Sequence, residues 1–138
     1  MSQKNEALVG MHILVAEDDK INQKVTRKIL EREGAAVSVV SNGEEALKAV
    51  ETDSFDLILM DLRMPVMNGF EATMAIRHRE TLSEGERITI VALSASALNE
   101  DKQTCLEAGM DGYLTKPVRR AELVRMISNV RSPLIDEC

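Results

Sequence analysis

The chain has 138 residues, of which 44% are hydrophobic and 29% are charged, and its formal net charge is -6 at pH 7. These values predict one soluble globular domain and argue against a general nucleic-acid or anionic-membrane binder, because both rely on clustered positive charge. No apolar run approaches the roughly 20 residues that span a bilayer, and residues 1–10 lack the apolar stretch of a signal peptide, so we expect a cytoplasmic location.

Short apolar or β-branched runs alternate with longer helical patterns along the chain. The runs cover residues 11–16, 37–40, 57–60, 88–93 and 112–115. The helical patterns after them carry apolar residues at helical spacing: Ile21, Val25 and Ile29; Ala46, Leu47 and Val50; Phe70 and Met74; Leu98, Cys105 and Leu106; Leu123, Ile127 and Val130. This alternation predicts βα units around a parallel sheet that helices cover on both faces.

Two glycines and the polar ends of the chain indicate where the helices and the domain end. Gly34 and Gly109 follow helical patterns, where a helix C-cap favours a residue that tolerates positive φ. We expect residues 1–10 to be a polar arm, residues 11–130 to be one domain and residues 131–138 to be a tail. Cys105 and Cys138 belong to no Cys/His cluster, so neither a disulfide framework nor a zinc site is expected.

Reactive polar residues follow four of the five predicted strands. They are Glu17–Asp19 after the first strand, Asp61 after the third, Ser94 after the fourth and Lys116 after the fifth. In open α/β sheets, ligands bind outside the carboxyl ends of the strands, at the point where the strand order reverses. The order 2-1-3-4-5 would bring these four ends to one crevice and leave the second strand at an edge.

Carboxylates and an ammonium in one crevice indicate a particular chemistry. The oxygen atoms of carboxylates are the ligands that Mg²⁺ prefers. A carboxylate can also attack phosphorus as a nucleophile and form an aspartyl phosphate. Asp61 is the candidate for this role, since a charge beside buried apolar residues is unfavourable unless it is paired or bound to a metal. Asp19 is expected to cap the helix that follows it.

Four motifs occur in order along the chain: ILVAEDDKINQ, LILMDLRMPVMNGFEA, ALSA and DGYLTKP. Over residues 11–130 the chain resembles the receiver domains of two-component response regulators, and it is similar to receivers fused to hybrid sensor histidine kinases. The resemblance implies a single α/β domain with a flavodoxin-like (βα)5 doubly wound parallel sheet. It also implies a phosphorylation switch in a phosphorelay, not an enzyme that turns over an external substrate.

The resemblance assigns roles to individual positions. Asp61 matches the phosphoacceptor, Lys116 the phosphate-binding lysine, Ser94 the switch hydroxyl and Tyr113 the aromatic ring that turns on activation. The signal is then expected to leave through the face of the fourth helix, fifth strand and fifth helix, and phosphorylation-dependent dimerisation is expected through the same face.

The resemblance also implies a magnesium site, with Mn²⁺ as an alternative ion. Its ligands are Asp18 directly, Glu17 through water, Asp61, and the backbone carbonyl of Arg63. The implied partner is a histidine kinase or a histidine phosphotransfer protein, and no direct contact of this domain with nucleic acid or membrane is expected. The domain would be cytoplasmic, either by itself or as the cytoplasmic part of a membrane-bound hybrid kinase.

Two other functions compete with this interpretation. Haloacid-dehalogenase-like phosphatases also use a strand-end aspartate and Mg²⁺, but their DxDxT pattern needs an acid where this chain has Arg63. A receiver that docks partners without being phosphorylated usually lacks the acidic pair or the acceptor, and this chain keeps both. The sequence does not distinguish a stand-alone receiver from a fragment of a hybrid kinase or of a regulator.

The lifetime of the phosphoryl group depends on the residues that hold the attacking water. Arg63 and Ser96 lie two residues beyond the acceptor and the switch hydroxyl, and neither is the carboxylate or amide that would best orient water. We therefore expect slow hydrolysis of the acyl phosphate.

Overall fold

The computed structural model describes residues 8–83, 87–95 and 99–131. Its strands are β1 (His12–Ala16), β2 (Ala36–Val40), β3 (Leu57–Asp61), β4 (Thr89–Ser94) and β5 (Gly112–Thr115). Its helices are α1 (Lys20–Arg32), α2 (Gly43–Thr52), α3 (Gly69–Ser83), α4 (Asn99–Ala108) and α5 (Arg120–Arg131). The strands form one parallel sheet in the order β2-β1-β3-β4-β5, which confirms the predicted fold class and strand order.

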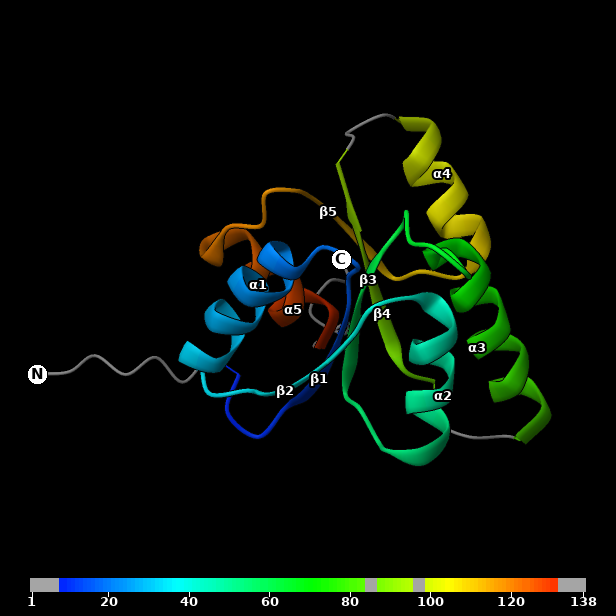
Figure 1. Ribbon diagram of the computed structural model, residues 1–138, viewed down its shortest axis with the longest axis horizontal. Coiled ribbons are helices and arrows are strands. Elements are labelled where there is room, and N and C mark those ends of the chain that lie inside the picture. The colour runs from blue at the N-terminus through cyan, green and yellow to red at the C-terminus, as the bar shows by residue number, and fades with distance from the viewer. Residues whose placement is uncertain (1–7, 84–86, 96–98, 132–138) are drawn as a thin grey trace, which may run out of the picture.

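Helices cover both faces of this sheet. α1 and α5 lie on one face and α2, α3 and α4 on the other (Figure 1). Because side chains alternate along a strand, each face has its own buried core. Ile13 and Val15 of β1 belong to the core under α1 and α5, whereas Leu14 and Ala16 belong to the other. This double burial explains why the strands are almost continuous apolar runs.

The apolar spacing that predicted α1 does not mark its buried side. Thr26 and Leu30 are the buried residues of the helix, whereas the side chains of Ile21 and Val25 are 72% and 47% exposed. One position along a helix is a rotation of about 100°, so the row of Ile21 and Val25 lies beside the buried row and faces outward. Only Ile29 of the predicted set packs against the core.

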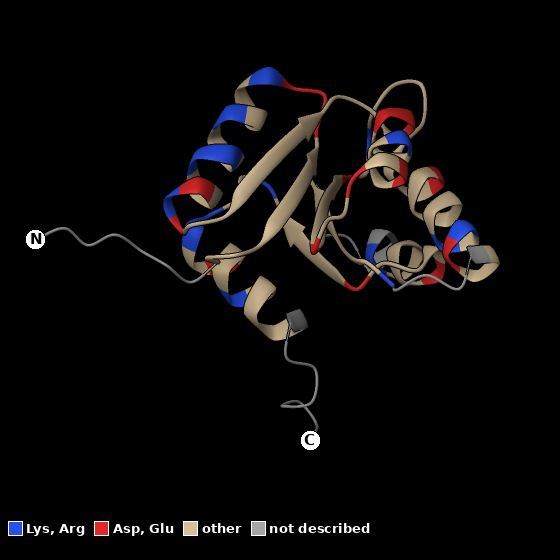
Figure 2. Cartoon of the chain, turned by 90° about the horizontal axis from the view of Figure 1, so that it is seen from below, with Lys and Arg blue, Asp and Glu red and all other residues tan. Residues whose placement is uncertain are grey.

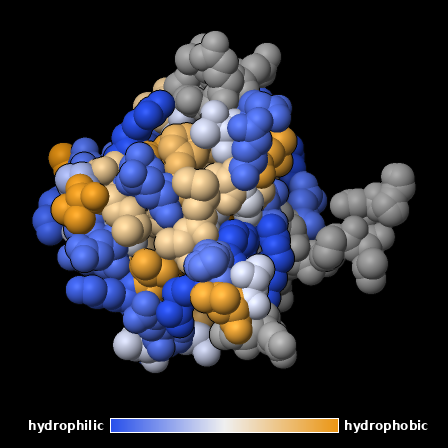
Figure 3. Space-filling view, turned by 90° about the vertical axis from the view of Figure 1, so that its right-hand side faces the viewer, coloured by the Kyte–Doolittle hydropathy of each residue, from blue (hydrophilic) through white to orange (hydrophobic). Residues whose placement is uncertain are grey.

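α3 differs from its predicted pattern in the same way. Met74 is exposed, whereas Phe70 packs against the core as predicted, and the buried residues of the helix are Ala72, Thr73 and Ile76. Figure 3 shows the side of the molecule that carries α2, α3 and α4, where apolar groups lie among hydrophilic ones. The apolar residues at helical spacing thus predicted that helices form, but not which side of α1 or α3 faces the sheet.

The helix ends follow the predicted local chemistry. The Asp19 carboxylate accepts hydrogen bonds from the backbone N–H groups of Ile21 (2.8 Å) and Asn22 (3.3 Å), so it caps α1. Gly34 and Gly109 have φ angles of 99° and 103°, as expected for residues that end helices. Within the described ranges, no helix combines the length and the apolar composition that a membrane crossing needs.

The folded core begins before the predicted domain boundary at residue 11. Leu8 was assigned to a polar arm, but its side chain is completely buried in the core under α1 and α5. Its backbone N–H donates to the carbonyl of Glu33 at 2.9 Å. The rest of the predicted arm and tail falls largely on residues 1–7 and 132–138, outside the described residues.

Candidate functional site

Three carboxylates meet at the carboxyl ends of β1 and β3. Glu17, Asp18 and Asp61 each offer an oxygen atom, and these oxygens lie within 4.8 Å of one another. Glu17 and Asp61 are buried, whereas Asp18 is exposed. Like charges that lie this close disfavour each other's ionised form unless a cation is present.

Lys116, which follows β5, supplies one such cation. Its Nζ donates hydrogen bonds to Glu17 Oε1 and Asp61 Oδ2, both at 2.9 Å. Burial lowers the pKa of Lys116, but the hydrogen bonds to Glu17 and Asp61 outweigh burial, so its pKa is raised overall. Burial raises the pKa of Glu17, and the hydrogen bonds from Lys116 and from the Asp19 N–H oppose that rise only in part.

The cluster still has more negative than positive charge. Three carboxylates face one ammonium, and the carboxylate of Asp61 gains one further donor, the backbone N–H of Arg63, 3.2 Å from its Oδ1. Hard carboxylate oxygens, one of them on an exposed residue, form the donor set that Mg²⁺ prefers. The residues at these strand ends therefore fit a divalent cation.

Ser94 lies at the neighbouring strand end. Asp61 pairs in register with Leu93, so Ser94 is one residue beyond the partner of Asp61 along β4. The Ser94 side chain is buried, and its carbonyl accepts a hydrogen bond from the Lys116 N–H at 2.7 Å. The peptide bond between Lys116 and Pro117 is cis. The structure thus brings the ends of β1, β3, β4 and β5 together, as the strand order predicted.

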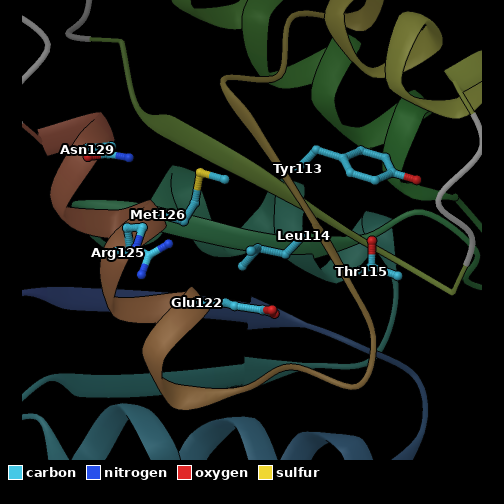
Figure 4. A pocket seen from close by; sticks show the side chains of 7 residues that line it. All are labelled: Tyr113, Leu114, Thr115, Glu122, Arg125, Met126 and Asn129. Carbon is cyan, nitrogen blue, oxygen red and sulfur yellow. The ribbon is translucent and has the colours of Figure 1, made fainter. Parts of the chain in front are cut away.

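Tyr113 lies on β5, three residues before Lys116. Its half-buried ring packs against the core under α2, α3 and α4, with Lys102 Nζ 5.6 Å from the ring centroid. A cavity of about 320 Å³ lies between β5 and α5, and its lining includes Met126 and Arg125. In Figure 4 the Tyr113 ring points away from these α5 side chains. The ring is therefore held on the α4 side of β5.

The start of α3 packs closely against the backbone of Asp61. A Cβ atom at Gly69 would lie only 2.3 Å from the carbonyl oxygen of Asp61, so the start of α3 approaches too closely for any other residue. Within the loop, Val66 has a φ of 70°, and the Met67 N–H donates to the Pro65 carbonyl at 2.7 Å. This is a tight three-residue turn around a strained residue.

The sequence alone did not indicate the roles of two residues in this region, Gln23 and Val66. Gln23 of α1 donates its side-chain amide to the carbonyl of Glu17 and fixes the end of β1. Its only signal was its place in the motif ILVAEDDKINQ. The strain at Val66 had no signal at all, because a valine in a loop does not predict a positive φ. Ser96, by contrast, was singled out but lies outside the described residues.

The sequence profile described as "Response regulator receiver domain" matches residues 13–128. The chain belongs to this family. Among curated proteins, the sensor histidine kinase GacS of Pseudomonas protegens is 41% identical to the receiver over 115 residues, which are 83% of this chain and 12% of GacS. The receiver spans only 6% to 14% of the length of five histidine kinases that it matches.

Solved structures give two further comparisons. One is the receiver domain of the sensor histidine kinase PA1611 from Pseudomonas aeruginosa PAO1, which has a magnesium ion coordinated in its active-site cleft. It is 43% identical to this chain, with a TM-score of 0.78, and the match covers 88% of this chain and 97% of that one. The co-crystal structure of Saccharomyces cerevisiae Ypd1, a histidine phosphotransfer protein, with the Ssk1 receiver domain gives 28% identity, a TM-score of 0.83 and coverage of 99% and 97%.

Proposed function

We propose that this receiver is a phosphorylation switch in which Asp61 accepts a phosphoryl group from a phosphohistidine on a partner protein. One observation carries the proposal: a single ammonium, Lys116 Nζ, lies 2.9 Å from the buried carboxylates of both Glu17 and Asp61. Phosphoryl transfer needs positioning and charge neutralisation more than covalent machinery, and this cluster provides both.

Different residues of the chain have different roles in the phosphoryl transfer. The P–N bond of the phosphohistidine breaks and a P–O bond to the Asp61 carboxylate forms, while the imidazole nitrogen keeps the electron pair. The Arg63 N–H orients Asp61 through Oδ1. Ser94 lies at the end of β4, which pairs with β3, and Lys116 follows β5, which pairs with β4. The Lys116 ammonium and the Ser94 hydroxyl would therefore bind oxygens of the transferred group.

Asp18, Glu17, Asp61 and the backbone carbonyl of Arg63 would hold Mg²⁺, with Mn²⁺ as a substitute. When bound, the ion supplies positive charge to the transferring phosphoryl group. The excess of carboxylates over cations supports this assignment, as does the magnesium ion in the cleft of the Pseudomonas aeruginosa receiver.

The proposed output is a change in Ser94 and Tyr113. A phosphoryl group on Asp61 would draw the Ser94 hydroxyl toward it and let the Tyr113 ring turn inward, which would reshape the face of α4, β5 and α5. That face would bind downstream partners or a second phosphorylated copy. The domain would work in the cytoplasm with a histidine kinase or a histidine phosphotransfer protein, and it would not turn over an external substrate.

Mass spectrometry after treatment with acetyl phosphate and Mg²⁺ tests the acceptor. The wild type should gain one phosphoryl group, and Asp61→Asn should gain none. Asp53→Asn is the matched control, because Asp53 is an exposed aspartate at the end of α2 and should leave labelling unchanged. Equal labelling of wild type and Asp61→Asn would refute the assignment.

A further inference from the structure

The edge strand β2 leads into α2 through a short segment, Ser41–Gly43, that contributes no carboxylate to the acidic cluster. The polypeptide here is nevertheless bonded to two segments that do. The Glu17 N–H donates to the carbonyl of Val40, the last residue of β2, at 3.0 Å. The Gly43 N–H donates to the carbonyl of Met67, in the loop between β3 and α3, at 2.8 Å. The end of β2 therefore connects the end of β1 with the loop that follows β3.

A side chain of α1 strengthens the connection to β1. The side-chain amide of Gln23 donates both to the carbonyl of Glu17 and, at 3.3 Å, to the hydroxyl of Ser41. Residues 17–19 lead directly into α1, the mostly blue helix of Figure 2, so Gln23 reaches back from the start of that helix. One amide thereby holds the carbonyl that immediately precedes Asp18 beside the end of β2.

The contact at the start of α2 leaves no room for a side chain. A Cβ atom at Gly43 would lie 2.4 Å from the carbonyl oxygen of Met67 and 3.0 Å from that of Asn68. Both oxygens belong to the backbone, so neither can move unless the loop moves. The start of α2 is itself fixed, because Asn42 Oδ1 accepts the N–H of Glu45 at 2.8 Å. α2, which lies beside α3 in Figure 1, thus holds the loop from outside.

The loop that α2 holds contains a strained turn. Val66 has a φ of 70°, an unfavourable value for a β-branched residue, and the Met67 N–H closes the turn on the Pro65 carbonyl. A strained conformation of this kind persists only where the surrounding structure imposes it. The residue directly after Val66 is the one that Gly43 holds through its carbonyl. The hydrogen bond from Gly43 therefore fixes the strained turn from outside the loop.

We propose that the segment Ser41–Gly43 positions the metal site, with Gly43 and Gln23 as its positioning residues. This inference rests on the proposed function, in which Asp18 and the backbone carbonyl of Arg63 bind Mg²⁺. Gln23 fixes the backbone before Asp18, and Gly43 fixes the loop that contains Arg63. Mg²⁺ demands nearly ideal octahedral geometry, so its affinity depends on how accurately these two ligands are spaced. Neither positioning residue binds the ion itself.

Isothermal titration calorimetry with Mg²⁺ tests the side of the loop. Gly43→Ala should weaken Mg²⁺ affinity about tenfold, because the added Cβ displaces the Met67 carbonyl and the loop with it. Gly112→Ala on β5 is the matched control. Its Cβ would meet the sulfur of Met126 at 2.8 Å, a flexible side chain, so Mg²⁺ affinity should remain within about twofold of wild type.

A side-chain substitution tests the side of β1. Gln23→Leu keeps a side chain of similar size but cannot donate a hydrogen bond, so it should weaken Mg²⁺ affinity about tenfold. Gln103→Leu makes the same change on α4, where the amide donates to Glu107 at 3.3 Å, and it should leave the affinity unchanged. Gln23→Leu decides the inference even where Gly43→Ala is too unstable for titration.

Labelling by acetyl phosphate separates positioning of the metal from damage to the acceptor. At low Mg²⁺ concentration, Gly43→Ala and Gln23→Leu should label Asp61 about tenfold more slowly than wild type. Saturating Mg²⁺ should restore most of the rate, because the defect lies in metal affinity. A variant whose acceptor is damaged would stay slow at every Mg²⁺ concentration, and that result would overturn the positioning role.

The affinity measurements keep this inference separate from the proposed function. Equal Mg²⁺ affinity in a variant and its control would overturn the positioning role of that residue, and the proposed function would stand. A wild type that neither binds Mg²⁺ nor is labelled by acetyl phosphate would refute the proposed function, and the inference would fall with it.

Discussion

Two clusters of ionic groups lie at opposite ends of the sheet and differ in their charge balance. At the carboxyl ends of the strands, Lys116 faces the three carboxylates of Glu17, Asp18 and Asp61. At the amino ends of β4 and β5, two arginines face two carboxylates: Arg77, Arg87, Glu80 and Asp111. The first cluster has more carboxylates than cations, and the second has equal numbers of both.

The neutral cluster is fully satisfied by its own residues. The Arg77 guanidinium donates to Asp111 Oδ2 and Glu80 Oε1, both at 2.9 Å, and to the carbonyls of Gly109 (2.9 Å) and Ile88 (2.7 Å). It thereby joins α3, the start of β4 and the turn before β5. Nothing in this arrangement calls for a further ligand.

Burial alone does not mark a reactive site in this receiver. Both clusters contain side chains that are largely buried, and both contain carboxylates bound by cations. What distinguishes the carboxyl-end cluster is the charge that its own residues leave unbalanced. The unbalanced cluster fits a metal ion and a phosphoryl group, whereas the balanced one holds the scaffold together.

The largest expected difference is in stability. Arg77→Ala should lower the free energy of unfolding by about 3 kcal/mol, because it removes the largely buried guanidinium that joins Asp111, Glu80 and two carbonyls, and leaves Asp111 with Arg87 as its cationic partner. Urea denaturation measures this loss, and Mg²⁺ should not restore it. The surface arginine Arg79, which pairs with Glu51, is the control, and Arg79→Ala should change stability by about 0–1 kcal/mol. A loss of under about 1 kcal/mol in Arg77→Ala would contradict the structural role.

The next effect is on metal affinity. Asp18→Asn should weaken Mg²⁺ binding at least about tenfold, because a hard cation loses one of its charged oxygen ligands. Isothermal titration calorimetry measures the affinity. Asp111→Asn removes a carboxylate from the neutral cluster instead, and it should leave Mg²⁺ affinity unchanged. Undiminished affinity in Asp18→Asn would remove Asp18 from the metal site.

A smaller effect follows from the raised pKa of Glu17. Above its ordinary value of 4.5, the unfolded chain releases the Glu17 proton while the folded, metal-free protein retains it, so stability in EDTA should fall as pH rises through this window. Glu17→Gln should abolish that part of the fall. At neutral pH it should raise Tm by a few degrees, the size of shift that about 1 kcal/mol gives in a small domain.

The raised pKa of Lys116 also makes stability fall as pH rises, but in a much higher pH window. Its contribution to stability is complete below its ordinary value of 10.5 and is lost only as the pH rises through its raised value. Thermal scans between pH 5 and 9 therefore report Glu17 rather than Lys116. A pH profile that is identical in wild type and Glu17→Gln would be inconsistent with the assignment.

The smallest effect concerns the lifetime of the phosphoryl group. Arg63 is exposed beside the acceptor, with its guanidinium carbon 6.0 Å from the centroid of the Phe70 ring. Arg63→Asn and Ser96→Glu would each offer water an acceptor, so both should speed phosphate loss a few-fold. Arg87→Asn, in the neutral cluster, should not. The prediction fails if Arg63→Asn and Ser96→Glu lose phosphate no faster than wild type.

The carboxyl-end cluster was predictable and the amino-end cluster was not. Parallel strands place their carboxyl ends at one edge, so Glu17, Asp61 and Lys116 could be brought together from the strand order alone. Arg77 lies in a segment with no motif, 34 residues from Asp111, which is the first residue of the motif DGYLTKP, and no rule of spacing relates the two. Long-range ion pairs of this kind depend on how α3 packs, which the sequence does not reveal.

Side-chain burial was the other limit of the sequence analysis. Leu8 belongs to the core although polar residues precede it, because its backbone N–H bonds to Glu33 at the end of α1. Ile21 and Val25 were apolar at helical spacing yet face outward. Periodicity identifies a helix, but apolar side chains on its exposed side make the pattern ambiguous about which side is buried.

The two cores of the sheet separate the side chains that a switch in β5 would move from those that would stay in place. On β5, Tyr113 belongs to the core under α2, α3 and α4, and its neighbour Leu114 belongs to the core under α1 and α5. Under the proposed function, a turn of Tyr113 would first repack the side of the sheet that α1 does not touch. The core under α1 and α5 would then serve as a fixed support against which the other side changes.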